Sequence, residues 1–397
     1  MLRSILDSRS AIRAAVLPLT MCSVFACQRS PQSNEAPAPI AGQAAATTEL
    51  QFALVSPYHN PQRDRVGVGA QHKDALKEAD DDMKKVLEEL QALGGRPLAL
   101  LPVGEARMQP THADAVKRVL ERQGKSTDPL PMASVETRMI PGGAGPIDAR
   151  IYTPQIAGPR KGLPVVVYWR GGGFVVASLD TYDASARAIA KYSDAIVVSL
   201  DYRRAPEHRF PAAHEDAFAG YKWVVHHAQA LGGDGKRFAV AGESAGANLA
   251  AYVSIMARDL GEQKPQHQLL VYPLAQADMH TKSYDDWAYA KPLDRASMVW
   301  FMDNYTNGPH DVKDPRLSLV DANLGGLPKT TIVLAEIDPL RTDGELLGAK
   351  LRAAGVEVKS KTYEGVTHEF FGMGAAVSDA RDAEEWAGAQ LKGAFQK

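Results

Sequence analysis

Ser244, Asp338 and His368, far apart in the chain, are residue types that could together carry acyl-transfer chemistry. Ser244 lies in GESAG, between Gly242 and Gly246, with the apolar run FAVAG before it and a helical run after it. This context predicts a tight strand-to-helix turn that holds the serine in a strained conformation and exposes its hydroxyl as a nucleophile. The glycine-serine string alone is also typical of a flexible turn, and the flanking strand and helix favour the nucleophile.

Asp338 and His368 are the residues that could activate Ser244. Asp338 follows the run TIVLAE, and His368 follows VEVKSKTY and is the only histidine after Asp338. An imidazole with an ordinary pKa of about 6.5 can take and return the serine proton, and a carboxylate behind it fixes its tautomer and stabilises its charge. Each residue alone could also be structural, a loop histidine or a helix N-cap aspartate before Pro339. The ordered set of three favours a catalytic triad.

A glycine run provides candidate donors for a developing negative charge. Arg170 is followed by three glycines and Phe174, and glycines let main-chain N–H groups face a substrate oxygen without obstruction. We predict oxyanion donors at Gly171, Gly172 and Ala245. A phosphate-binding loop is disfavoured because no Gly-Lys-Ser/Thr follows, and a dinucleotide site because the Gly-x-Gly-x-x-Gly spacing is missing.

Alternating strand and helix patterns are expected to position these residues. Helical stretches such as 211–231 and 344–355 separate most of the short β-rich runs, which cover residues 165–169, 195–202, 238–242, 269–273, 331–336 and 356–363. Such alternation predicts an α/β fold with a mainly parallel sheet, helices on both faces and reactive groups at the carboxyl ends of the strands. Before them, the pattern predicts amphipathic helices over 75–93 and 112–123 and a strand pair over 135–141 and 147–154.

Composition limits the class of partner. The 45 basic and 47 acidic side chains give a net charge of −2 without long single-sign runs, which argues against nucleic acid and favours a small, weakly charged molecule. Both cysteines, Cys22 and Cys27, lie in the first 27 residues, so disulfides and cysteine metal sites are excluded from the rest of the chain.

The first 70 residues have the pattern of an export segment and a tether. Residues 1–27 combine three arginines with an apolar run and predict a signal peptide, and VFAC ending at Cys27 is similar to a bacterial lipoprotein processing site. An ordinary cleaved signal is the alternative. Residues 28–70 begin with a stretch rich in Pro, Ala, Ser and Gln that predicts a flexible linker. The expected location is the periplasm or the outer membrane, with lipid at Cys27 as a candidate anchor.

The assembled motifs resemble the bacterial hormone-sensitive-lipase-like carboxylesterases, family IV of the α/β-hydrolase fold. Besides GESAG and the glycine run, the resemblance rests on DYRRAPEHRFPAAHEDA, AEIDPLRTDGE and GVTHEFFGM, in that order. It implies a catalytic domain over 131–397 and a cap made of helices in 71–130 and an insertion near 276–312. Aromatic residues of that insertion, including Trp287 and Tyr289, are expected to line the substrate pocket.

Two residues depart from the family pattern, and both are included among the expected pocket residues with Phe174. Arg170 stands where the family usually has histidine, and Glu243 where it usually has aspartate. Because Arg170 adds a permanent charge and a longer reach, we hypothesise that it changes the glycine loop or favours a carboxylate-bearing substrate.

The resulting functional prediction is hydrolysis of short-chain acyl esters through an acyl-enzyme on Ser244, with no metal or organic cofactor. Amide hydrolysis, deacetylation and transacylation on the same scaffold remain open, because they share the triad and differ in pocket shape. A catalytically weak surface lipoprotein that binds ligands is the alternative from another class. A second copy of the chain is a candidate partner.

Overall fold

The computed structural model describes residues 73–158 and 161–396, so the predicted signal peptide and linker lie outside the described residues. Within these ranges eight strands form one sheet in the order β1-β2-β4-β3-β5-β6-β7-β8. β2 pairs antiparallel with β1 and β4, whereas the strands from β4 to β8 pair in parallel. The predicted, mainly parallel α/β sheet is therefore confirmed. The strands are β1 (Met132–Pro141), β2 (Pro146–Pro154), β3 (Leu163–Trp169), β4 (Ile196–Leu200), β5 (Gly233–Glu243), β6 (His267–Val271), β7 (Lys329–Ile337) and β8 (Val358–Thr367).

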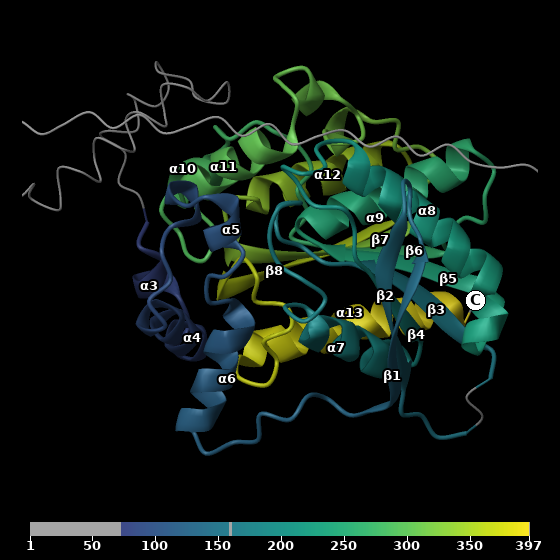
Figure 1. Cartoon of the computed structure of the whole chain (residues 1–397), viewed down its shortest axis with the longest axis horizontal. Coiled ribbons are helices and arrows are strands. Elements are labelled where there is room, and N and C mark those ends of the chain that lie inside the picture. The colour runs from purple at the N-terminus through teal and green to yellow at the C-terminus, as the bar shows by residue number, and fades with distance from the viewer. Residues whose placement is uncertain (1–72, 159–160, 397) are drawn as a thin grey trace, which may run out of the picture. The chain divides into compact units, whose positions relative to one another are not determined.

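Helices cover both faces of this sheet (Figure 1). One face carries α7 (Asp183–Ser193) and α13 (Ser378–Phe395). The other carries α8 (Ala212–His227), α9 (Ala245–Asp259) and α12 (Arg341–Ala353). Because side chains alternate along a strand and both faces are covered, every residue of β3 is buried. Short 3-10 turns complete the connections at Leu98–Leu100, Ala228–Leu231, Asp311–Lys313 and Leu319–Asp321.

The alternation along β3 separates two parts of the core. Val165, Val167 and Trp169 pack in the cluster that contains residues of α8, α9 and α12. Val166 and Tyr168 pack in the cluster that contains residues of α7 and α13. The two clusters pack the sheet against the helices on each face. The loops that leave the carboxyl ends of the strands therefore start from a rigid layer.

The N-terminal helix differs from its prediction. Instead of one helix over 75–93, the structure has α3 (Ala75–Glu78) and α4 (Asp81–Ala92), with extended backbone at Ala79 and Asp80. The break occurs because Asp80 N donates a 2.9 Å hydrogen bond to Gly365 O, in β8. A contact across the chain thus overrides the helical pattern.

The remaining elements lie near one end of the sheet. α5 (Val103–Ala106) and α6 (His112–Arg122), the latter close to its prediction, follow α4, and α10 (Lys282–Asp286) and α11 (Arg295–Tyr305) follow β6. In Figure 1, α3 to α6, α10 and α11 gather at the same end of the molecule. A helix long and apolar enough to cross a membrane is not found in the described part of the chain.

Candidate active site

Ser244 occupies the strained turn between β5 and α9 that the glycine spacing predicts. Its backbone has φ 55° and ψ −119°, a conformation that a residue with a side chain rarely adopts. A Cβ at Gly246 would overlap Trp169 O, and one at Gly242 would overlap Gly246 O. Ser244 N donates to Val271 O at 2.9 Å, which ties the turn to β6. The serine is therefore held by backbone that only glycine neighbours permit.

Asp338 and His368 meet at the carboxyl ends of β7 and β8. His368 Nδ1 lies 2.7 Å from Asp338 Oδ2, while Asp338 Oδ1 accepts a 2.8 Å hydrogen bond from Leu340 N. Both side chains are buried, with 2% and 0% exposure. Burial opposes the charged imidazole, but the charge and hydrogen bond of Asp338, with Glu369 nearby, raise the pKa of His368 above its ordinary value. Asp338 is not the helix N-cap considered as the alternative, because that position before α12 is Leu340; its second oxygen instead fixes the loop that leads into the helix.

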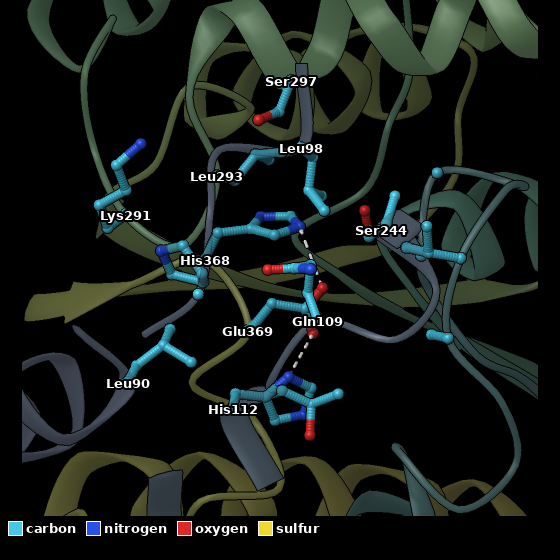
Figure 2. A pocket seen from close by; sticks show the side chains of 18 of the residues that line it. Leu90, Leu98, Gln109, His112, Ser244, Lys291, Leu293, Ser297, His368 and Glu369 are labelled. Carbon is cyan, nitrogen blue, oxygen red and sulfur yellow. Dashed lines mark ion pairs between the residues drawn. The ribbon is translucent and has the colours of Figure 1, made fainter. Parts of the chain in front are cut away.

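Ser244 and His368 line one cavity of about 760 Å³. Figure 2 shows the two side chains facing the same space from opposite sides. Between described residues, no hydrogen bond joins the serine hydroxyl to the imidazole. Such contacts are often long before substrate binds, and the arrangement leaves both groups accessible to one reacting carbonyl.

A second acidic residue, Glu369, lies beside the histidine. Its backbone φ is 70°, in the left-handed region, and its carboxylate accepts a 2.7 Å hydrogen bond from the Tyr182 hydroxyl. Glu369 Oε1 is 3.9 Å from His368 Nε2, and its Oε2 is 3.6 Å from His112 Nδ1. Figure 2 shows this carboxylate between the two imidazoles. Burial lowers the pKa of His112 although the charge of Glu369 opposes that shift, and the same charge contributes to the raised pKa of His368.

The glycine loop presents amides to the cavity. Gly172, Gly173 and Ala245 line it. Gly171 O accepts hydrogen bonds from Arg170 Nη1 at 3.0 Å and Tyr202 Oη at 2.9 Å. Because C=O and N–H point in opposite directions across a trans peptide, the Gly172 N–H points away from these two side chains. Gly172 O likewise accepts from Val175 N and Val176 N, which turns the Gly173 N–H away from that turn.

The predicted donor Gly171 does not line the cavity, and the structure corrects that expectation. A Cβ there would overlap the Tyr182 hydroxyl, so this position is covered by a side chain. Gly173 takes its place in the wall, where the ring of Phe301 from α11 packs against it so closely that a Cβ would collide with it.

Arg170 is not a pocket residue, contrary to the prediction. It is fully buried and donates to Asp201 Oδ1 from Nη2 at 2.6 Å and from Nε at 3.0 Å. Nη1 donates to Gly171 O and to Val176 O, and the guanidinium stacks 4.3 Å from the centroid of the Tyr202 ring. Since these contacts engage all three guanidinium nitrogens and the side chain is fully buried, Arg170 holds the glycine loop from behind instead of reaching the substrate.

Of the other predicted pocket residues, only Tyr289 lines the cavity. Phe174 stacks on Tyr305 with 4.0 Å between ring centroids, and Trp287 is buried against Ala75, Ala290 and Ile337. Apolar character alone predicted pocket positions for these rings, but they are packed into the core.

Glu243, also predicted to lie in the pocket, is buried behind it. The hydroxyls of Tyr168 and Tyr272 donate to its two oxygens. Burial raises its pKa to about 8 although these hydrogen bonds oppose the shift. The extra methylene beside Ser244 therefore reaches a tyrosine pair and not the substrate space.

Sequence reasoning missed several residues that line the cavity. They include Glu369, which directly follows the predicted base, and His112, Arg107 and Arg204. Adjacency to His368 was a usable signal for Glu369. The others come from segments whose approach to the site depends on the packing of the whole domain.

The comparisons with known proteins agree with this geometry. Residues 166–372 match the family described as alpha/beta hydrolase fold. Carboxylesterase NlhH of Mycobacterium tuberculosis is 39% identical over 72% of this chain and 91% of its own length. Ethyl acetate hydrolase of Pseudomonas putida is 32% identical over 72% of this chain and 88% of its own.

Solved esterase structures are similar as well. The esterase of Pyrobaculum calidifontis has 38% identity and a TM-score of 0.69, over 77% of this chain and 96% of that one. A thermostable esterase of Pseudomonas putida has 32% identity and a TM-score of 0.72, over 81% and 98%. The chain belongs to the bacterial hormone-sensitive-lipase-like carboxylesterases, family IV of the α/β-hydrolase fold. It is a carboxylic ester hydrolase.

Proposed function

We propose that this enzyme hydrolyses short-chain acyl esters with Ser244 as nucleophile, His368 as general base and acid, and Asp338 as the residue that orients the imidazole. The observation that carries the proposal is the buried 2.7 Å pair of His368 and Asp338 beside a cavity that Ser244 also lines. The relatives named as an ethyl acetate hydrolase and a carboxylesterase support the same chemistry.

In the first half-reaction Ser244 Oγ attacks the ester carbonyl carbon as His368 Nε2 takes its proton. The tetrahedral oxyanion receives hydrogen bonds from the amides of Gly172, Gly173 and Ala245. Its collapse breaks the bond to the alcohol oxygen, which leaves with the proton from His368. The acyl group remains on Ser244.

The second half-reaction uses water in place of the alcohol. His368 removes a proton from the water, hydroxide adds to the acyl carbon, and the carboxylic acid leaves as Ser244 recovers its proton. Asp338 stabilises the imidazolium in both steps. The length of the acyl chain is limited by the apolar wall of the cavity, which includes Leu98, Leu293, Met298 and Phe301.

A chain-length series of p-nitrophenyl esters, from acetate to palmitate, tests the proposal. We expect the highest kcat/KM between acetate and hexanoate, and loss of activity in Ser244→Ala. Ser126→Ala is the matched control, because Ser126 is an exposed loop serine bonded to Asp128. Equal activity on palmitate would refute the short-chain preference, and an active Ser244→Ala would refute the nucleophile.

For localisation, we propose that the chain is exported and anchored through lipid on Cys27. The support is the arginine-rich, apolar segment that precedes this cysteine. Growth of expressing cells with a radioactive fatty acid should label the full chain and leave Cys27→Ala unlabelled. Equal labelling of both, or of neither, would contradict the anchor.

A further inference from the structure

The cations that line the cavity differ in how their charges are matched. Arg96 pairs with Glu105 at 3.1 Å, Arg107 with Glu207 at 2.7 Å, and Lys291 with Asp294 at 2.6 Å. Lys73 lies 5.0 Å from the centroid of the Trp287 ring.

Among the arginines that line the cavity, Arg204 is the exception. Within the described ranges, no carboxylate lies within 4.0 Å of its guanidinium, although it too lines the cavity. Arg204 Nη1 donates a 3.1 Å hydrogen bond to Ala177 O, and between described residues the other guanidinium N–H groups form no hydrogen bond. This half-buried arginine is therefore a cation without an anion.

Arg204 stands next to the proposed oxyanion donors. Ala177, whose carbonyl it binds, packs so closely behind Gly172 that a Cβ on that glycine would lie 2.9 Å from the Ala177 methyl group. Burial, together with the positive charges of Arg170 and Arg107, lowers the pKa of Arg204. The guanidinium is thus partly stripped of water and lies near two other guanidinium groups, beside the loop that carries the proposed oxyanion donors.

The acidic residues of the cavity do not neutralise it. Glu369 is bound by Tyr182 and faces the two histidines. Asp74 caps α3 through Leu76 N and lies 3.6 Å from Lys77. Around Arg204, the carboxylates of Asp201 and Glu207 are engaged by Arg170 and Arg107. Three guanidinium groups therefore share two carboxylates, and the local balance lacks one negative charge.

We propose that a carboxylate of the substrate supplies this charge, so that Arg204 selects esters that carry a free carboxylate. The proposal rests on the proposed esterase function and names its substrate class. A planar guanidinium binds a carboxylate through two parallel N–H···O bonds, and partial burial strengthens the pairing. The carboxylate preference first considered for Arg170 belongs to Arg204 instead, because Arg170 is fully buried and already paired with Asp201.

Paired substrates that differ in one charge test the proposal. On the acyl side, the p-nitrophenyl half-ester of adipate is compared with p-nitrophenyl hexanoate. On the alcohol side, 4-acetoxybenzoate is compared with 4-acetoxytoluene. We expect kcat/KM to favour the anionic member of one pair by about tenfold, the scale of a charge-assisted contact. The pair that responds identifies the side of the ester that faces Arg204.

In Arg204→Gln this ratio should fall by about tenfold, and Arg204→Lys should retain part of it because the charge stays while the planar fork is lost. Arg138→Gln controls for the change in net charge, since Arg138 pairs with Glu136 on the exposed edge strand. A wild-type ratio of one or below in both pairs, or a preference that survives in Arg204→Gln, would overturn the proposal.

Binding without turnover separates this inference from the proposed function. Calorimetry on the Ser244→Ala protein should give about tenfold tighter binding of the preferred anionic ester than of its neutral partner, and Arg204→Gln added to it should abolish the difference. Equal affinities would refute the carboxylate site even if esterase activity is high. Tighter anionic binding by an enzyme that hydrolyses nothing would refute the esterase proposal alone.

Discussion

The floor and the wall of the cavity are built differently. On the floor, at the carboxyl edge of the sheet, Ser244, Asp338 and His368 are 6%, 0% and 2% exposed and are held by strained turns or buried hydrogen bonds. On the wall, Tyr289 is 68% exposed and most cations form partly exposed ion pairs. The difference indicates that chemistry depends on preorganised backbone, whereas selectivity depends on side chains that can change at little structural cost.

The largest effect is expected on the floor, from Asp338→Asn. The amide would hold His368 in the wrong tautomer, so kcat should fall by about 10⁴ with little change in KM. Steady-state kinetics on p-nitrophenyl acetate measures both. Asp128→Asn, at an exposed loop position, is the control. A loss below tenfold would place the orienting role elsewhere and weaken the contrast between floor and wall.

The next largest effect on activity is expected from Arg170→Met, which removes the guanidinium that holds the glycine loop from behind. The Gly171 carbonyl and Asp201 would keep only their hydrogen bonds from Tyr202, so kcat should fall by about 10²–10³ as the oxyanion amides lose their alignment. The free energy of unfolding should fall by about 2–3 kcal/mol, less than for a fully buried pair because Asp201 is partly exposed.

Kinetics and urea unfolding of Arg170→Met, beside Arg138→Met on the exposed β1 edge, separate the two effects. Full activity in a destabilised Arg170→Met protein would show that the loop keeps its shape without the guanidinium.

A smaller effect is expected where floor and wall meet, at Glu369. Its charge contributes to the raised pKa of His368, and a general base must be neutral to accept the serine proton. Activity therefore rises with pH through this pKa, and Glu369→Gln should move the acid limb of kcat/KM to lower pH. The variant keeps relatively more activity in acid than the wild type does.

The pH profile on a neutral ester checks this expectation, and Glu136→Gln on the surface is the control. An acid limb that stays in place, or moves to higher pH, would show that Glu369 only supports the loop through Tyr182.

The smallest effect is expected on the wall, from Tyr289→Ala. Because most of this side chain faces solvent, its contact with an ester is small, and KM should change by about two- to fivefold with kcat nearly constant. Michaelis parameters across the chain-length series measure it. A hundredfold loss of kcat would contradict the division between floor and wall.

Much of the fold could be predicted because its signals are local. Buried β-rich runs such as 165–169 are strands, and glycines at 242 and 246 leave a serine between strand and helix little conformational choice. The break between α3 and α4 could not be predicted, because it depends on a hydrogen bond from Asp80 to a residue 285 positions away. The predictions that placed Trp287 and Phe174 in the pocket were wrong for a related reason, since an aromatic side chain packs into a core as readily as it lines a pocket.

By itself the sequence determined the order of strands and helices, the strained serine turn and the one histidine that can follow Asp338, because these depend on side-chain periodicity, glycine spacing and chain order. Only the tertiary structure decided where each charged side chain points and which partner it meets. It turned Arg170 inward to Asp201 and left Arg204 at the cavity without a carboxylate. The physical reason is that the electrostatic role of a charged side chain depends on its burial and its partners, which come from distant parts of the chain.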